Sequence, residues 1–481
     1  MTQSKLARNK EITRFLIYAI ICSLGWILPA PDPITPTGLK VLFVFVATVY
    51  GWTVTGHVWP SLFSCLMFPL TGVVTMKQFI AMGWGTDIFF FMILAFVLCK
   101  FLEEVGVSQF MASWLLSRKL LKGHPWRLIT MILAAAYLIS SLVNIFIGML
   151  LIWEIIYTIT NIIGQKPGDK FPSLMVFGVA MAGALSLSAM PWSGNAIVNL
   201  GVYGNLIGQT PNMVTYIAFS LPVGFASFLA YVALCKFVFK LDVTPLKTIK
   251  DEMIDPKHLE LTLVKKIALL ALIAFIVLLL LPSLLPQGPI VDFLNHFGVV
   301  GVIVLVFGIL SLIKIDDNHI FNFGQLASKG IPWTMMIMVM VILSIGGCLM
   351  NPATGINDYL DANLAPILTS LSPLMFIIAI TLITVLLTNF LINMVIVAML
   401  LPIIISMSET LGINPEQISY LVMVASTIAI LTPAASAAST ILYPNKKWIQ
   451  TKEIYRYGCV TVAVVTVLAI LISYLTAAII Y

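Results

Sequence analysis

Long apolar segments alternate with short polar segments along nearly the whole chain. An α-helix needs about 20 mostly apolar residues to cross a bilayer, so the longer segments are predicted to span a membrane. Other segments are too short alone and are typical of broken or re-entrant helices. We therefore expect an all-α polytopic membrane protein with about 11 transmembrane helices. The apolar segments fall near residues 12–28, 38–56, 58–70, 86–102, 126–142, 145–163, 172–187, 214–239, 265–285, 297–313, 331–349, 373–391, 394–408, 419–431 and 457–480.

The composition supports a lipid environment. Of the 481 residues, 60% are hydrophobic and 10% are charged, whereas soluble domains average roughly 45–50% apolar and about 25% charged residues. A soluble fold could not bury this much apolar surface. The six cysteines lie in or beside apolar segments without a CxxC motif or a Cys/His ligand spacing, so we interpret them as small buried hydrophobes.

Lysine and arginine are unevenly distributed, and this predicts the orientation of the chain. Basic loops favour the cytoplasmic side of a membrane. No lysine or arginine occurs between Lys329 and Lys446, where the polar loops carry acidic residues. We therefore predict that those loops lie outside, and that a cytoplasmic N-terminus leads into a retained first helix in the plasma membrane. The basic groups assigned to the cytoplasm are Lys5, Arg8, Lys10 and Arg14 and those of segments 118–127, 236–266 and 446–456.

The two halves of the chain show the same order of elements. Each half contains a predicted hairpin, at 126–163 and 373–408, and then an apolar segment with a polar interruption. Basic loops flank the first hairpin and acidic loops flank the second, so the two enter from opposite faces, unless 126–163 is a pair of full spans. Inverted repeats with paired broken elements are typical of secondary transporters. We predict scaffold helices at 1–70, a first inverted repeat at 71–240, a cytoplasmic linker at 241–264 and a second inverted repeat at 265–481.

Polar and helix-breaking residues interrupt the apolar segments at 140–144, 190–195, 388–393 and 432–440. A broken helix leaves unpaired main-chain N–H groups, which suit an anion, and unpaired C=O groups, which with Asn and Ser oxygens suit a small cation such as Na⁺. The predicted substrate-binding residues are Asn144, Asn195, Asn393, Thr432, Ser436 and Ser439. The predicted ligands of a coupling cation are Ser141, Asn144, Ser193, Thr388 and Asn393.

Alternatives remain open for these residues. Ser and Thr can bond back to helix carbonyls, and Asn can hold helices together, without either contacting a solute. Glu154 is either a functional carboxylate within the membrane or a residue at the cytoplasmic interface. An intramembrane enzyme is disfavoured because the sequence has no HExxH motif and no metal-ligand spacing.

The second hairpin resembles that of a known carrier family. The segment from Thr388 to Pro402 is similar to the hairpin of the divalent anion/sodium symporters, the relatives of di- and tricarboxylate carriers. In that family a Ser-Asn-Thr tip is followed by an apolar run that ends in Leu-Pro. By this resemblance Asn393 takes the place of the tip asparagine, and Asn144 takes that of the first hairpin.

The two helix interruptions carry the same resemblance. The segment Gly194-Asn195-Ala196-Ile197 resembles the Thr-Pro-Pro-Asn-Ala-Ile break of the family. The segment 432–441 resembles the second copy, with Ser436 at the position of the Thr and Ser439 at that of the Asn. The Pro-Pro pair is absent from both breaks. The resemblance covers nearly the whole chain and implies a dimeric, elevator-like carrier.

The hairpin tips depart from the family pattern. They read Val143-Asn144-Ile145 and Ile392-Asn393-Met394, so four hydroxyls are replaced by apolar groups. The leading hypothesis is a Na⁺-coupled carrier of a di- or tricarboxylate, with no cofactor besides Na⁺ and no nucleic-acid partner. The alternatives are an H⁺-coupled carrier, an anion exchanger, or a channel or flippase for a more apolar anionic cargo.

Overall fold

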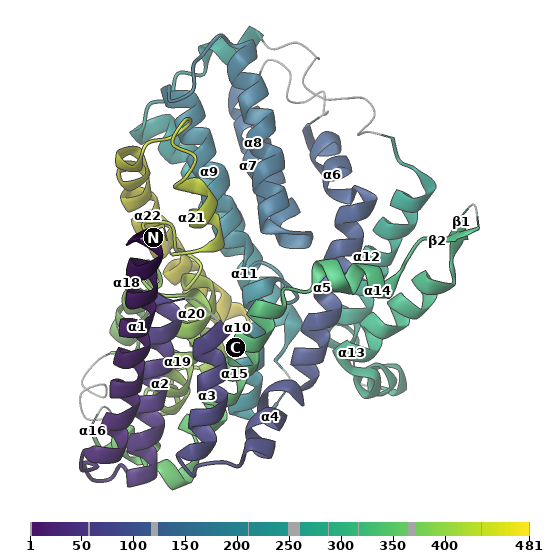
Figure 1. Cartoon of the computed structure of the whole chain (residues 1–481). Helices are drawn as coiled ribbons and strands as arrows, with labels where there is room; N and C mark the ends of the chain where they lie inside the picture. The colour runs from purple at the N-terminus through teal and green to yellow at the C-terminus, as the bar shows by residue number, and fades with distance from the viewer. Residues whose placement is uncertain are drawn as a thin grey trace.

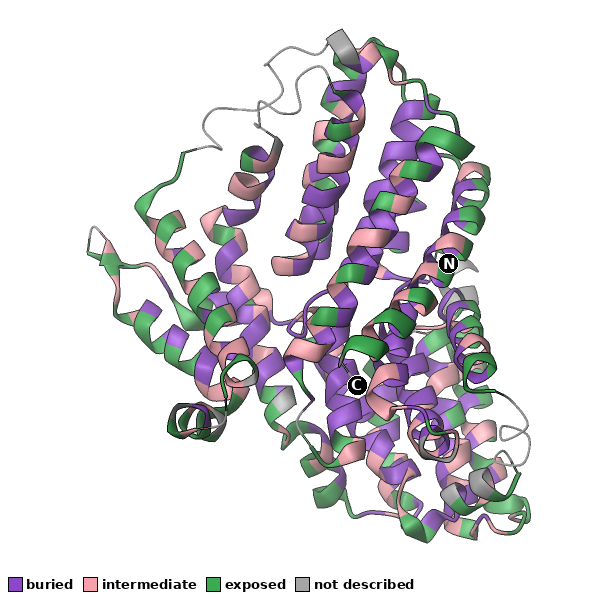
Figure 2. Cartoon of the chain, turned by 180° about the vertical axis from the view of Figure 1, so that it is seen from behind, coloured by how far each residue is buried: buried purple, intermediate pink, exposed green. Residues whose placement is uncertain are grey.

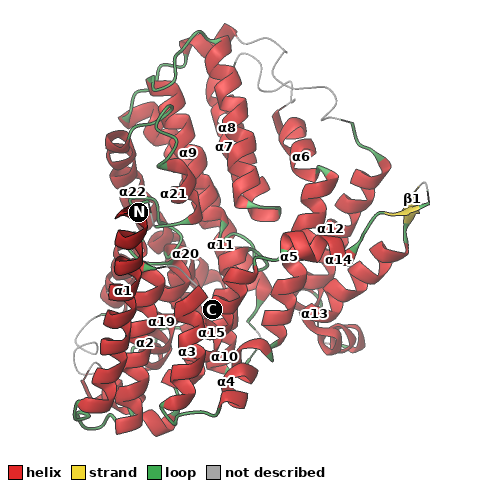
Figure 3. Cartoon of the chain, in the orientation of Figure 1, coloured by secondary structure: helices red, strands yellow, loops and turns green. Residues whose placement is uncertain are grey.

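The computed structural model is almost entirely helical (Figures 1 and 3). It describes residues 2–55, 58–116, 124–209, 211–248, 260–286, 288–315, 317–363, 372–433 and 435–480. Within these ranges the only sheet is a two-stranded antiparallel ribbon that pairs Lys314 with His319. The all-α class predicted from the apolar segments is therefore confirmed.

Eleven α-helices form the first half of the chain, and they end in two short turns of other helix types. Their bounds are α1 (Thr2–Ile27), α2 (Pro36–Val54), α3 (Val58–Leu70), α4 (Met76–Trp84), α5 (Asp87–Val105), α6 (Val107–Leu116), α7 (Pro125–Leu142), α8 (Ile145–Ile162), α9 (Lys170–Ser186), α10 (Gly194–Ile207) and α11 (Met213–Ala233), followed by a π-helical turn (Leu234–Val238) and a 3₁₀ turn (Thr244–Thr248).

The second half contains ten described α-helices and the short ribbon. Their bounds are α12 (Leu263–Leu284), α13 (Pro289–Leu312), β1 (Lys314–Ile315), β2 (Asn318–His319), α14 (Phe323–Gly330), α15 (Trp333–Leu349), a 3₁₀ turn (Pro352–Thr354), α16 (Ile356–Asn363), α18 (Pro373–Thr388), α19 (Asn393–Thr410), α20 (Pro415–Ala425), α21 (Ala437–Leu442) and α22 (Thr451–Ile480).

Each half contains one helical hairpin and one broken helix. The hairpins are α7–α8 and α18–α19, and the broken pairs are α9–α10 and α20–α21. Helices α7, α8 and α9 pack against one another in the upper part of Figure 1, whereas α10, α19 and α20 lie in the lower part. Helix α10 packs on α5, α15 and α19, and α21 packs on α9. The two halves therefore interlock through their broken helices.

The broken helices also form the buried centre of the molecule. Every residue from Phe171 to Ser186 of α9 is buried, and so is every residue from Ile418 to Ala425 of α20. Figure 2 shows the exposed residues gathered on the peripheral helices and the buried ones at the centre. Only 22% of the apolar window of α12 is buried, which leaves most of its outer face to lipid.

Six of the described helices are long and apolar enough to cross a membrane, or seven if the bent pair α14–α15 counts as one span. These helices include both arms of the first hairpin, α7 and α8, whereas α18 and α19 are among the shorter apolar helices. The expected number of about 11 spans stays a prediction, as do the inverted topology and the division into repeats.

Two of the predicted apolar segments lie beside helix breaks, and some predicted loops lie outside the described residues. The apolar segment 419–431, which is too short to span a membrane alone, contains the end of α20 at Ala425, and residues 426–433 are not helical. The segment 297–313 coincides with the apolar second part of α13, His296–Leu312, and the kink of this helix is at Gly298, where φ is 62°. Most of the basic loop 118–127 and the centre of the linker 241–264 lie outside the described residues.

Candidate functional site

The two hairpins place their asparagines at the turns. Asn144 is the N-cap of α8, directly after the C-cap of α7, and Asn393 is the first residue of α19. Pro125 and Pro373 begin α7 and α18, at positions where a helix N–H has no partner within the helix. The sequence therefore located both tips correctly.

The arms of the first hairpin lie very close to each other. A Cβ atom at Gly148 of α8 would lie 2.2 Å from Ser140 Oγ and 2.8 Å from Ser140 N on α7. Only glycine permits this approach of side chain and backbone. The contact fixes the direction in which the turn projects from the two arms.

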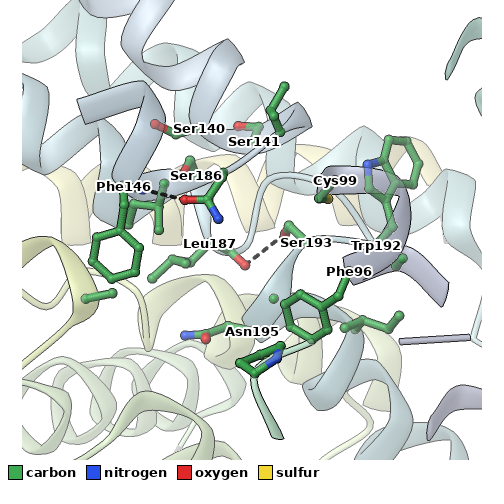
Figure 4. Close-up of a pocket in the computed structure, with 18 of the residues that line it drawn as sticks. Phe96, Cys99, Ser140, Ser141, Phe146, Ser186, Leu187, Trp192, Ser193 and Asn195 are labelled. Carbon is green, nitrogen blue, oxygen red and sulfur yellow. Dashed lines mark hydrogen bonds between the residues drawn. The ribbon is translucent and has the colours of Figure 1, made fainter. Parts of the chain in front are cut away.

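A cavity of about 290 Å³ lies beside this turn (Figure 4). It is bounded by α5, the first hairpin tip, the break between α9 and α10, the bend between α14 and α15, and the start of α21. Its polar side chains are Ser140, Ser141, Asn144, Ser186, Ser193 and Asn195, and its larger apolar ones include Met92, Phe96, Phe146, Trp192, Ile197 and Met335. None of the described residues that line it carries a charge at neutral pH.

The two ends of the Asn144 amide have different roles. Its Oδ1 accepts hydrogen bonds from the N–H groups of Phe146 at 2.8 Å and Ile147 at 3.4 Å. This caps α8 and leaves the amide NH₂ group as the part of the side chain that can bind a solute. An NH₂ group is a donor, so Asn144 suits an anion better than a cation.

The first helix break contributes Ser193 and Asn195. Ser193 Oγ lies 2.9 Å from the carbonyl oxygen of Leu187 (Figure 4) and 2.7 Å from that of Met190, and its hydroxyl holds the non-helical turn in shape. No side chain caps the N-terminus of α10. Asn195, in the first turn of α10, is 8% exposed and lines the cavity. The N-termini of both α8 and α10 therefore border the cavity and bring partial positive charge to it.

Two further lining groups have no hydrogen-bond partner among the described residues. They are Trp192 Nε1 and Ser140 Oγ, and both are buried. A buried donor without a partner costs about 1–3 kcal/mol, and both of these atoms are covered by other protein atoms. The sequence analysis did not select either residue, because a single Trp or Ser beside a break is common in helix packing.

In the second half, Thr388 and Asn393 form a buried oxygen cluster. Thr388 Oγ1 donates to Asn393 Oδ1 at 3.0 Å and also contacts the carbonyl oxygen of Ser426 at the end of α20. Thr388 is fully buried, and Asn393 is 3% exposed. Neither residue lines the cavity. The structure thus separates these two predicted site residues from Asn144 and Asn195.

Asn389 holds the second helix break in place. Its Oδ1 accepts from the N–H groups of Ile430 at 3.0 Å and Leu431 at 2.8 Å, and its Nδ2 donates to the carbonyl of Ile428 at 3.2 Å. The hydroxyl of Thr432 in turn donates to the main-chain carbonyl of Asn389. The hairpin tip and the break are therefore one hydrogen-bonded unit. Asn389 lies within the interruption at 388–393 but was not among the predicted site residues.

Ser436 and Ser439 mainly stabilise the start of α21. Ser436 caps this helix by accepting from the N–H of Ser439 at 3.2 Å, and Ser439 Oγ lies 3.4 Å from the carbonyl oxygen of Ala429. Of the described residues in the second break and α21, only Ala437 lines the cavity. Ser436, Ser439 and Thr432 thus form local hydrogen bonds, as in the alternative in which these hydroxyls bond to the protein and not to a solute.

Of the remaining residues considered from the sequence, Ser141 lines the cavity and Glu154 does not. Ser141 lines the cavity although its hydroxyl donates to the carbonyl of Tyr137 at 2.6 Å. Glu154 is exposed on α8 and does not line the cavity, so it takes no part in this site. Among the described residues, no group of three or more His, Cys, Asp or Glu side chains could hold a metal ion.

The two helix breaks also contact each other directly. Ser188 Oγ, in the first break, donates to the carbonyl of Met423 at 3.1 Å and lies 3.3 Å from Thr427 Oγ1 in the second. Tyr216 OH of α11 donates to the carbonyl of Ser188 at 2.7 Å. The cavity and the oxygen cluster are thus parts of one connected centre.

Comparison with known proteins gives one family match. The family model described as "Citrate transporter" (CitMHS) matches residues 41–425. Among curated proteins, the "Uncharacterized transporter MJ0672" of Methanocaldococcus jannaschii is 25% identical over 173 residues, which are 35% of this chain and 38% of that protein. The match therefore spans less than half the length of that relative.

Two solved transporters share the fold. The YdaH transporter of Alcanivorax borkumensis has a TM-score of 0.59 at 15% identity, with 96% of this chain and 98% of that chain covered. MtrF of Neisseria gonorrhoeae, described as illuminating a class of antimetabolite efflux pumps, has a TM-score of 0.60 at 15% identity, with 96% and 94% covered. These similarities concern the fold alone.

Proposed function

This chain belongs to the citrate transporter family, and we propose that it is a secondary active transporter that moves a small organic anion together with Na⁺. The family match confirms the resemblance to divalent anion/sodium symporters, and it places the chain among membrane transporters and not among enzymes. Within this family the proposed substrate is a di- or tricarboxylate, and the proposed mechanism is elevator-like alternating access.

The observation that carries the proposal is the set of donors around the cavity. The Asn144 amide NH₂ and the N–H groups at the N-terminus of α10 offer hydrogen, the capped N-terminus of α8 adds partial positive charge, and no acidic side chain of the described lining opposes them. Donors and helix N-termini bind anions without a buried cation. This arrangement supports an anionic solute.

The apolar lining favours a substrate with an apolar part. Phe96, Phe146, Trp192 and Met335 surround the polar groups, and a volume of about 290 Å³ is at the small end of ligand cavities, which run from roughly 300 to 1,000 Å³. An aromatic or branched monocarboxylate is therefore the second candidate substrate, in line with a more apolar anionic cargo.

The proposed cation site is the oxygen cluster of the second half. Thr388 Oγ1, Asn393 Oδ1 and the Ser426 carbonyl are three neutral oxygens brought together in a buried place. Oxygen donors are the ligands that hard cations such as Na⁺ prefer. H⁺ coupling and anion exchange are the alternatives, and both predict transport that ignores a Na⁺ gradient.

The remaining parts of the proposal rest on the family resemblance and on the distribution of charge. They are a homodimer in the plasma membrane of the cell, with the N-terminus in the cytoplasm. The basic N-terminal segment supports a cytoplasmic N-terminus, and the apolar outer face of helices such as α12 supports a membrane location.

Uptake by purified protein in proteoliposomes tests the function. Radiolabelled citrate, succinate and benzoate are offered with an inward Na⁺ gradient, with an inward H⁺ gradient, and with no gradient. Concentrative uptake of one probe that depends on Na⁺ supports the proposal. Uptake that only follows the gradient of the anion itself identifies a channel, and failure of all three probes contradicts the proposed substrate class.

A thermal-shift measurement gives an independent test of binding. A ligand that binds the native state raises the unfolding midpoint by mass action. We expect the transported anion to raise the midpoint in detergent, and Na⁺ to increase that shift. The same shift with choline in place of Na⁺ would contradict a sodium site.

A further inference from the structure

A cluster of four charged side chains lies directly beside the uncharged cavity. On α5, Phe96 and Cys99 line the cavity, and Lys100 is the next residue. On α14, Lys329 directly precedes Gly330, which also lines the cavity. The cluster is therefore one residue away from the lining on both of these helices.

The ends of these two elements are in close contact. A Cβ atom at Gly330 would lie 2.6 Å from Lys100 Cβ and 3.2 Å from the carbonyl oxygen of Phe96. The end of α14 thus rests on the stem of Lys100, and α15 leaves this point at an angle of 76°. The two lysines come from segments more than 200 residues apart and meet at the edge of the cavity.

Both lysines are held by glutamates. Lys100 Nζ lies 2.8 Å from Glu103 Oε1 and 4.0 Å from Glu104 Oε1, and Lys329 Nζ lies 3.5 Å from the same oxygen of Glu104. The side chains of Lys100, Glu103 and Glu104 are 19%, 34% and 33% exposed. The cluster is neutral overall, and a solute can reach it.

Residues spaced by four along α5 connect this cluster with the cavity. Phe96, Lys100 and Glu104 follow one another at i, i+4 and i+8, so they lie along the same side of the helix. A carboxylate that moves along this side passes the ion pairs before it reaches the apolar lining. It loses hydration on that path, and a cation at the edge of the cavity offsets part of this cost.

We propose that Lys100 and Lys329 form a carboxylate-binding station at the edge of the cavity, where the carboxylate of the substrate displaces Glu104. The inference rests on the proposed anion transport. The exchange replaces one carboxylate partner of the lysines by another, so the lysines stay paired. The station selects anions, and the cavity beyond it binds the rest of the substrate.

The test is the dependence of uptake on substrate concentration in proteoliposomes, with whichever of citrate, succinate or benzoate the wild-type protein takes up. We expect Lys100→Gln and Lys329→Gln each to raise KM about tenfold with little change in the maximal rate, because each removes one charge-assisted bond. Lys100→Arg retains the charge and is expected to restore KM. Lys77→Gln, at an exposed lysine of α4, is the matched control and is expected to behave as wild type.

A fourth variant separates this role from simple stabilisation. Glu104→Gln removes the carboxylate beside Lys329 and leaves Lys100 paired with Glu103, and we expect it to lower KM about threefold. A structural role of the ion pairs predicts no gain in affinity and a lower thermal midpoint. Unchanged KM in both lysine variants, or a lower maximal rate at unchanged KM, would overturn the station while leaving anion transport in place. Absence of wild-type uptake would instead remove the proposed function, and the station with it.

Discussion

At the scale of single residues, the amide of Asn144 separates capping from binding. Asn144→Asp retains an oxygen to cap α8 but replaces the NH₂ donor by a negatively charged oxygen. We expect uptake to fall at least tenfold and the thermal midpoint to stay near that of wild type. Asn144→Ala is expected to lose uptake and also about 1 kcal/mol of helix-cap stability.

Asn161→Ala is the matched control for Asn144, since it changes an exposed asparagine near the other end of the same helix. It is expected to transport as wild type does. Normal uptake by Asn144→Asp would show that the amide NH₂ does not bind the anion.

Asn393→Ala is predicted to abolish Na⁺-driven uptake, which follows from the oxygen cluster with Thr388.

Asn389 illustrates a residue whose importance is mainly structural. Truncation to alanine leaves the N–H groups of Ile430 and Leu431 and the carbonyl of Ile428 without their partner in a buried place. We expect Asn389→Ala to reduce the free energy of unfolding by about 3 kcal/mol, measured by chemical denaturation in detergent. Asn389→Asp keeps both accepted bonds but places a charged oxygen against the carbonyl of Ile428, and it is expected to lose at least as much. Equal stability of the alanine variant and wild type would show that Asn389 does not hold the second helix break in place.

At the scale of elements, the close approach within the first hairpin depends on Gly148. An alanine there would bring a Cβ within 2.2 Å of Ser140 Oγ and 2.8 Å of Ser140 N, and the second contact is with backbone that cannot rotate away. We expect Gly148→Ala to lower stability by about 1–3 kcal/mol and to reduce uptake, because the tip is displaced. Gly308→Ala in α13, which meets nothing within 4 Å, is the control and should be neutral or slightly stabilising.

The sequence predicted these elements well where the chain itself carries the signal. Asn, Pro and Gly inside apolar segments are conspicuous, and they marked both hairpin tips and both breaks. The sequence could not show that Asn144 and Asn195 share a cavity while Asn393 does not, because that depends on how α5, α14 and α21 pack around the tip of the first hairpin. It also missed Asn389, whose partners are main-chain groups about 40 residues further along the chain.

At the scale of the whole molecule, the two halves meet where their broken helices touch. Ser188 is bonded to Met423 and Thr427 in a fully buried contact. A double-mutant cycle with Ser188→Ala and Thr427→Val is expected to give a coupling energy of about 1 kcal/mol in unfolding. Strictly additive effects would show that this contact does not join the halves. Such couplings between distant segments could not be predicted from the sequence, whereas the helical class and the family pattern could.

The uncharged lining of the cavity makes the protein a poor sensor of acidity. Between about pH 5 and 7 no described lining residue belongs to a type that ordinarily gains or loses a proton. Saturable uptake should therefore follow the ionised fraction of the cargo itself, and two anions of different acidity should give pH profiles displaced by the difference between their own pKa values. As the pH falls, uptake of the stronger acid would therefore persist to a lower pH than uptake of the weaker acid.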